Sequence, residues 1–220
     1  NQEIFYFEIV KMKNITISLI TFTFGVISLV LSCQSSDSNK VNSSTPASSD
    51  AKVLPDSVYL RMGKEYALGA QTVLGKNLTE AIQKKGTTYA VDFCNTRAYP
   101  LTDSMSKKFN VLLKRVTDKE RNRANRANES ELEILSAMKK NIDEGKSPEP
   151  QLVRNIGKVT AYYAITTTAL CLQCHGSKDK DINTETFNKI RTLYPSDNAI
   201  GYGINQLRGI WAVQMEVRTN

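Results

Sequence analysis

Three residues near the C-terminal part of the chain have the types and the spacing that bind an iron porphyrin. Cys171 and Cys174 are separated by two residues, and His175 follows directly. Two thiols at this spacing can form thioether bonds to the two vinyl groups of a haem, and the next residue can then bind the iron. His175 is the only histidine of the chain. The motif therefore predicts one covalently attached haem c, with His175 as an axial ligand of its iron.

Three other uses of the same residues stay open at the level of the motif. A structural zinc site takes four Cys or His ligands, and only Cys94 would be left to complete one in the folded part. A thioredoxin-like redox pair uses the same cysteine spacing but does not need the histidine. A structural disulfide between Cys171 and Cys174 is the third alternative.

The second axial ligand of such an iron cannot be another histidine of this chain. Methionine, cysteine, lysine, tyrosine, water or no ligand remain as alternatives. Met62, Met138 and Met215 have the spacing of core residues, which is the usual role of methionine in a fold. Cys94 is the cysteine left when the motif and Cys33 are assigned. An inert, buried core cysteine is the alternative for Cys94.

The first part of the chain resembles an export signal. Residues 14–31 form an apolar run behind Lys11 and Lys13, and Met12 is the expected true start. The sequence Val30-Leu31-Ser32-Cys33 resembles a bacterial lipobox, in which the cysteine receives lipid. An uncleaved membrane helix is the alternative. We expect a signal region at 1–32, a lipidated Cys33 with a Ser- and Asn-rich tether to residue 55, and a folded domain at 56–220.

The folded domain must supply the elements that position the motif. Apolar residues at helical spacing predict an N-terminal helix over 57–85, ended by Gly86. A second helix should place Ala90 and Cys94 on its inner face and end at Pro100. Residues 109–116 favour a strand or a helix end. Asn128 and Glu131 form the capping box of another helix that ends near Gly145.

The later part of the chain favours strands. Residues 158–168 are rich in β-branched and aromatic residues, and residues 209–217 have a similar character. The two segments should pair antiparallel, with the haem motif on the connection between them. Helices first and strands later predict an α+β domain.

An ordered set of segments in this chain resembles the Tll0287-like haem-c domain family over residues 57–217. The segments are Ala90 to Pro100 with Cys94, Arg121-Asn122 and Asn125, Cys171 to Gly176, Tyr194 to Tyr202, and Leu207 to Gly209. The resemblance implies a PAS-like fold, an antiparallel sheet flanked by helices, and haem ligated by His175 and Cys94. The family usually has prolines where Arg123 and Ala127 stand, so the shape of that loop can differ here.

Arginines near the motif are candidates for the haem carboxylates. Arg121 and Arg123 can each donate two parallel hydrogen bonds to a propionate, and solvated side chains are the alternative. Arg208 is a weaker candidate for the same role.

Two functions follow for such a haem. The first is a redox or gas-ligand sensor module that passes its signal to another protein through movement of the helix bearing Cys94. The second is an electron-transfer cytochrome, tethered to a membrane and exchanging electrons with a protein partner. A haem enzyme is disfavoured because no second histidine is present for acid–base work.

Charge and targeting features set the expected partners and location. The net charge of +7 is dispersed among acidic residues, and no aromatic-rich basic patch indicates nucleic acid. We therefore expect an exported lipoprotein that faces the periplasm or the cell surface, with haem, a membrane and an unidentified protein as its partners.

Overall fold

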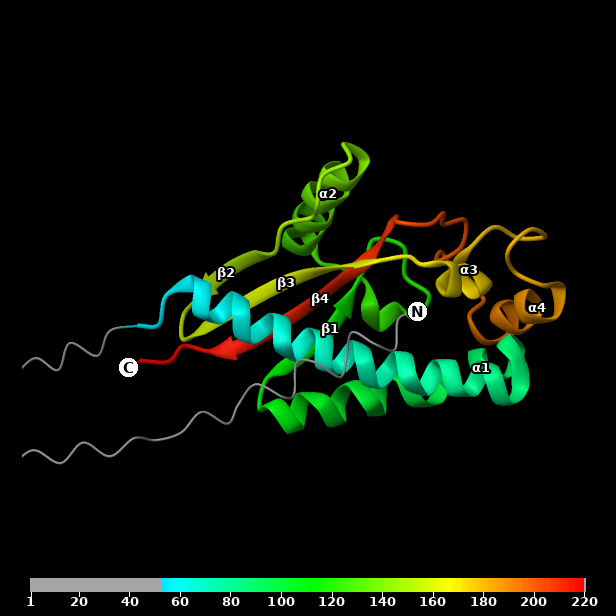
Figure 1. Ribbon diagram of the computed structural model, residues 1–220, viewed down its shortest axis with the longest axis horizontal. Helices are drawn as coiled ribbons and strands as arrows, with labels where there is room; N and C mark the ends of the chain where they lie inside the picture. Colours follow the sequence, from blue (N-terminus) through cyan, green and yellow to red (C-terminus); the bar gives the residue numbers. More distant parts are fainter. Residues whose placement is uncertain (1–52, 220) are drawn as a thin grey trace, which may run out of the picture. The chain divides into compact units, whose positions relative to one another are not determined.

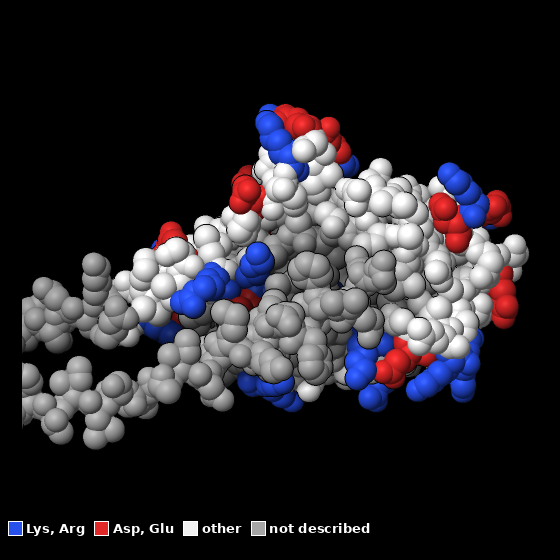
Figure 2. Space-filling view, in the orientation of Figure 1, with Lys and Arg blue, Asp and Glu red and all other residues white. Residues whose placement is uncertain are grey.

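The computed structural model describes residues 53–219, which form an α+β domain (Figure 1). The expected signal region, Cys33 and nearly all of the tether lie outside these residues and stay predictions. Within residues 53–219, no helix is both long enough and apolar enough to cross a membrane. On the face shown in Figure 2, basic and acidic side chains are interspersed. Lys84 pairs with Glu80 and Lys140 pairs with Glu144 at i,i+4 spacing.

The first element, α1 (Asp56–Phe109), consists of two helical arms. Gly86 interrupts the helix with a backbone that only glycine adopts readily (φ 77°, ψ 176°), so the chain turns there. The second arm then returns along the first, as Figure 1 shows, and the rings of Tyr66 and Phe109 stack with their centroids 4.8 Å apart. This hairpin brings Cys94, on the second arm, back over the domain.

Four strands form one antiparallel sheet. They are β1 (Leu112–Val116), β2 (Gln151–Asn155), β3 (Lys158–Thr166) and β4 (Leu207–Glu216), in the order β1-β4-β3-β2. In the central pair, Tyr163 of β3 lies opposite Trp211 of β4, and Trp211 lies opposite Arg115 of β1. The strands β1 and β2 therefore form the two edges, and the longer strands lie in the middle.

Alternating side chains bury both faces of the sheet. One face packs against α1 in a core made of Tyr59, Ala67, Ala70, Met105, Leu113, Val159, Ala161, Trp211, Val213 and Met215. The other face packs against α2 (Glu129–Asp143) in a core made of Val116, Ala127, Ile134, Leu135, Met138, Tyr162, Ile210 and Ala212. The helices thus flank an antiparallel sheet, and the expected α+β, PAS-like class with an N-terminal helix is confirmed.

Two short helices follow β3 at one end of the sheet. They are α3 (Ala169–His175), which carries the cysteine–histidine motif, and α4 (Thr184–Leu193). A third core, formed by Val91, Ile182 and Ile190, joins α1 to α4, and Cys174 packs against it. The motif is therefore held between the second arm of α1 and α4.

Most expected elements are present, with two corrections. The capping box of α2 is confirmed, since Asn128 and Glu131 each accept from the other's backbone N–H. The expectation that the second helix ends at Pro100 is wrong, because the arm continues to Phe109. Pro100 removes one hydrogen bond to Thr96, an exposed residue whose carbonyl water can satisfy. Residues 151–155, for which the sequence patterns predict no element, form the edge strand β2.

Candidate functional site: the cysteine–histidine motif

The imidazole of His175 is held in one orientation by the segment that leads to β4. Its Nδ1 lies 2.7 Å from the carbonyl oxygen of Ala199. The ring of Tyr202 meets the imidazole edge-on, with the ring centroids 6.3 Å apart. The backbone N–H groups of Tyr202 and Gly201 donate to the carbonyls of His175 and Gly176, each at 2.9 Å. Residues 199–202 therefore fix both the backbone and the side chain at the end of α3.

The protonation of His175 follows from these contacts. Burial and the charges of Arg121 and Arg208 lower its pKa well below the usual value, so the imidazole is neutral near pH 7. A neutral imidazole carries one proton, and a carbonyl oxygen can only accept. The proton therefore lies on Nδ1, and Nε2 keeps the lone pair that binds a metal ion.

Arg121 ties the motif to the same segment. Its guanidinium donates to both carboxylate oxygens of Asp197 at 3.1 Å and to the carbonyl of Cys174 at 2.6 Å. Asp197 also accepts from the backbone N–H of Ala199 at 3.0 Å. The side chain of Asp197 is 1% exposed and that of Arg121 is 12% exposed. This buried pair thus fixes the carbonyl that orients His175.

The motif cysteines are half-buried on α3, and all three described cysteines have free thiols. The hydroxyl of Thr168 lies 3.4 Å from the sulfur of Cys171. Burial, opposed by Arg121, raises the pKa of the Cys174 thiol to about 11. The two thiols are therefore presented on one short helix that ends at His175.

Cys94 lies on the second arm of α1, three residues after Val91, which belongs to the core that Cys174 packs against. Burial raises the pKa of its thiol, and the charges of Arg115 and Arg121 lower it in part. Cys94 in turn raises the pKa of Cys174, which places the two thiols in one electrostatic environment. The structure thus brings Cys94 to the same end of the sheet as Cys174.

The remaining arginine candidates lie apart from one another. Arg123 contacts the hydroxyl of Ser196 at 3.4 Å in an exposed position. Arg208 donates from Nη1 to the hydroxyl of Thr117 at 3.0 Å and to the carbonyl of Lys119 at 3.2 Å. The guanidinium of Arg121 is directed to Asp197 and the motif backbone, and its predicted contact with a propionate stays a prediction.

The residues present fit an iron porphyrin. A porphyrin supplies four nitrogen ligands, so the protein has two positions to fill, and Nε2 of His175 and the Cys94 sulfur are suitable donors. Two buried polar atoms, Oη of Tyr202 and Nε of Arg208, have no hydrogen-bond partner within the described residues. Among these residues, no three His, Cys, Asp or Glu side chains lie together so as to hold a metal ion.

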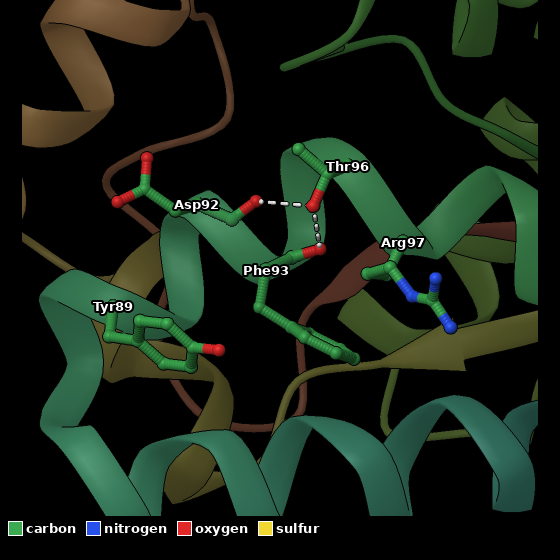
Figure 3. Close-up of a pocket in the computed structure, with 5 residues that line it drawn as sticks. All are labelled: Tyr89, Asp92, Phe93, Thr96 and Arg97. Carbon is green, nitrogen blue, oxygen red and sulfur yellow. Dashed lines mark hydrogen bonds between the residues drawn. The ribbon is translucent and has the colours of Figure 1, made fainter.

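A shallow pocket of about 300 Å³ lies on the second arm near Cys94 (Figure 3). Its lining residues are Tyr89, Asp92, Phe93, Thr96 and Arg97. The hydroxyl of Thr96 donates to the carbonyls of Asp92 and Phe93, and the Asp92 carboxylate pairs with Lys189 of α4 at 2.9 Å. Cys94 is not one of its lining residues, so this pocket is distinct from the motif.

Some positioning residues are missed by the sequence patterns. Asp197 and Ala199 were indicated only as part of the Tyr194 to Tyr202 segment of the family resemblance, yet they orient His175. Arg115 was placed in a strand without a role, although it acts on Cys94. The available signal was alternation: Leu113 is an inward residue of a strand, so Arg115, two residues later, must share that face.

Comparisons with known proteins indicate one family. The model of the Tll0287-like family, described as Tll0287, matches residues 32–215. A solved structure described as the crystal structure of the cyanobacterial heme-protein Tll0287 is 20% identical in sequence, with a TM-score of 0.47. The match covers 70% of this chain and 97% of that chain. No curated protein matches this chain.

Proposed function

This chain belongs to the Tll0287-like family, and we propose that it is a haem protein with one covalently attached haem c. Cys171 and Cys174 would form the thioether bonds, and His175 and Cys94 would bind the iron. The observation that carries the proposal is the 2.7 Å contact between Nδ1 of His175 and the Ala199 carbonyl. This contact leaves Nε2 as the lone-pair donor beside the two motif thiols.

Each residue has a separate role toward the haem. Ala199 sets the imidazole orientation, which raises the basicity of the ligating nitrogen as backbone carbonyls do at other metal sites. The Cys94 thiol is protonated when it is not bound to metal, since burial raises its pKa, and it loses its proton when it binds the iron. When bound, the haem supplies one-electron redox chemistry and a centre for small gas ligands.

A sensor role is supported by the position of Cys94 in α1. The second arm that bears Cys94 turns at Gly86 into the first arm, which begins at Asp56 directly after the expected tether. Movement of Cys94 would therefore be passed along α1 to Asp56, the residue that follows the expected tether in the sequence. We propose that the protein is a redox or gas-ligand sensor module that signals to a separate protein.

A second candidate function, electron transfer, is supported by the exposure of the motif. Cys171, Cys174 and His175 all keep part of their surface accessible. An attached haem would therefore have an edge close to solvent, where a partner can exchange electrons. The net charge of +7 would favour docking on an acidic partner.

Export and lipid anchoring complete the proposal. The apolar run at 14–31, the lipobox-like sequence before Cys33 and the polar tether support an exported lipoprotein. Attachment of haem c takes place outside the cytoplasm in bacteria, so the two expectations agree with each other. The proposed location is a membrane surface that faces the periplasm or the outside of the cell.

Absorption and electron paramagnetic resonance spectra test the ligand assignment. The holoprotein should show a low-spin ferric signature with thiolate ligation, and Cys94→Ala should lose it while keeping the covalent haem. Thr96→Ala changes an exposed residue two positions further along the same arm and should keep the signature. An unchanged spectrum in Cys94→Ala would remove Cys94 from the iron.

Gas binding and electron exchange separate the two candidate functions. Carbon monoxide binding to the reduced holoprotein, with loss of the Cys94 ligand, is expected for the sensor. Rapid electron exchange with a soluble cytochrome and no carbon monoxide binding would instead support the carrier and contradict the sensor.

A further inference from the structure

Arg115 points into the layer between the sheet and α1. It lies two residues after Leu113, which is 3% exposed in the core against α1, and opposite Trp211 in the register of β1 with β4. Its guanidinium carbon lies 5.8 Å from the centre of the Trp211 ring. A charged side chain thus occupies a position at which the neighbouring inward residues are apolar.

Among residues 53–219, no acidic side chain forms an ion pair with Arg115. Within the described residues, its guanidinium makes no hydrogen bond and no ion pair. The titratable groups that act on it are Cys94, Tyr99 and Tyr194, which are uncharged when protonated. Burial lowers the pKa of Arg115, as expected for a cation with little solvent.

Three other arginines of the domain have carboxylate partners, and Arg208 donates to the Thr117 hydroxyl and the Lys119 carbonyl. The pairs are Arg121 with Asp197 at 3.1 Å, Arg126 with Glu120 at 2.9 Å, and Arg154 with Asp56. A half-buried charge without a hydrogen bond or a counter-ion loses solvation without compensation, so Arg115 is suited to bind an anion other than the side chains of residues 53–219. A guanidinium binds a carboxylate through two parallel hydrogen bonds.

We propose that Arg115 binds a propionate carboxylate of the haem. The inference rests on the proposed function and adds an anchoring residue to it. The charge of Arg115 acts on both Cys94 and His175, the two proposed axial residues. The register gives the geometry: Arg115 is the penultimate residue of β1, and its partner Trp211 also pairs with Tyr163 of β3. Because β3 is the strand that leads into α3, Arg115 lies toward the end of the sheet that carries the motif, where a carboxylate of a bound haem would meet it.

Resonance Raman spectra of the holoprotein test the assignment, because propionate bending and iron–sulfur stretching give separate bands. Arg115→Gln should shift the propionate band and leave the iron–sulfur band in place. The reduction potential should fall, since an uncompensated carboxylate favours ferric iron. Lys114→Gln is the matched control, because it removes one positive charge from the residue directly before Arg115 in β1. Lys114 is exposed on the opposite face of the sheet, so this variant should shift neither band.

Two outcomes would overturn the inference while leaving the haem in place. A shifted iron–sulfur band with an unchanged propionate band would show that Arg115 pairs with the Cys94 thiolate instead. Unchanged bands in Arg115→Gln would show that it pairs with neither. If Arg115→Gln does not fold, Arg115→Lys replaces it. Lysine keeps the positive charge but cannot form the two parallel hydrogen bonds of a guanidinium, so an unchanged propionate band in Arg115→Lys would contradict the inference. Wild-type protein without covalent haem would overturn the proposed function and the inference together.

Discussion

At the scale of single residues, the site depends on a chain of contacts that ends at one imidazole. Arg121 binds Asp197, Asp197 accepts from the N–H of Ala199, and the Ala199 carbonyl accepts from His175. Each contact is buried or partly buried, so each is stronger than the same contact in water. The orientation of His175 is therefore set by residues more than 20 positions away in the sequence.

Asp197→Asn tests this chain of contacts. The substitution keeps the side-chain volume but leaves the guanidinium of Arg121 without a counter-ion in a site where Asp197 is 1% exposed. Breaking a buried pair in this way should lower the free energy of unfolding by about 3 kcal/mol. Chemical denaturation of the holoprotein measures the loss.

The control for Asp197 is an exposed pair of the same chemistry. Asp56, whose side chain is 60% exposed, pairs with Arg154. Asp56→Asn should cost under about 1 kcal/mol, because solvent screens the pair. Equal losses in the two variants would contradict a special role for the buried pair.

The chemistry-bearing residues could be found from the sequence, and their partners could not. Cys171, Cys174 and His175 are adjacent, so their spacing alone predicts haem attachment. Cys94 was singled out as the remaining cysteine and by the family resemblance. Arg121 was one of two candidates for a propionate, and no pattern in the sequence indicated that the fold would bring Asp197 within hydrogen-bond distance of it.

At the scale of elements, the two-armed helix α1 decides where Cys94 lies. Gly86 makes the turn, and without a turn at that point the second arm would not return over the domain. The Cβ that any other residue would add at Gly86 meets no atom within 4 Å. Only the backbone conformation therefore requires glycine at this position.

Gly86→Ala should destabilise the protein by about 1–3 kcal/mol, because alanine is strained at a φ of 77° with extended ψ. Gly75→Ala is the matched control, since its added Cβ also meets no atom within 4 Å but its backbone is helical. That change should stabilise the protein by about 0.5–1 kcal/mol. Denaturant unfolding measures the free energy of unfolding of both variants. A change of the same sign in both would contradict the claim that the backbone at position 86 requires glycine.

Elements were predictable where a local pattern defines them. The capping box of Asn128 and Glu131, the helix stop at Gly86 and the β-branched run of β3 are all local signals. The edge strand β2 lacked such a signal, because it follows a loop with two prolines and is stabilised by pairing with β3. Pro100 was predicted to end the second arm. The arm continues to Phe109 because proline removes only one hydrogen bond, on the exposed face of the helix.

At the scale of the whole molecule, three hydrophobic cores hold the elements around the motif in place. Two of them fix the sheet between α1 and α2, and the third joins the second arm of α1, the motif and α4. The motif thus lies at one end of the sheet, and Cys94 lies on the helix that follows the expected tether in the sequence. This arrangement is suited to a haem whose ligation affects the position of α1.

The central claim, a haem joined to the chain by two thioether bonds, is tested most directly by the mass and thiol content of the denatured protein. The protein is produced with its signal in a host that attaches haem c, then unfolded, reduced and alkylated, and the labelled cysteines are located by peptide mapping. We expect the mass of one added haem on the peptide with Cys171 and Cys174, and alkylation of Cys94 but of neither motif cysteine. Alkylation of Cys94, Cys171 and Cys174 together, without added haem mass, would contradict the account.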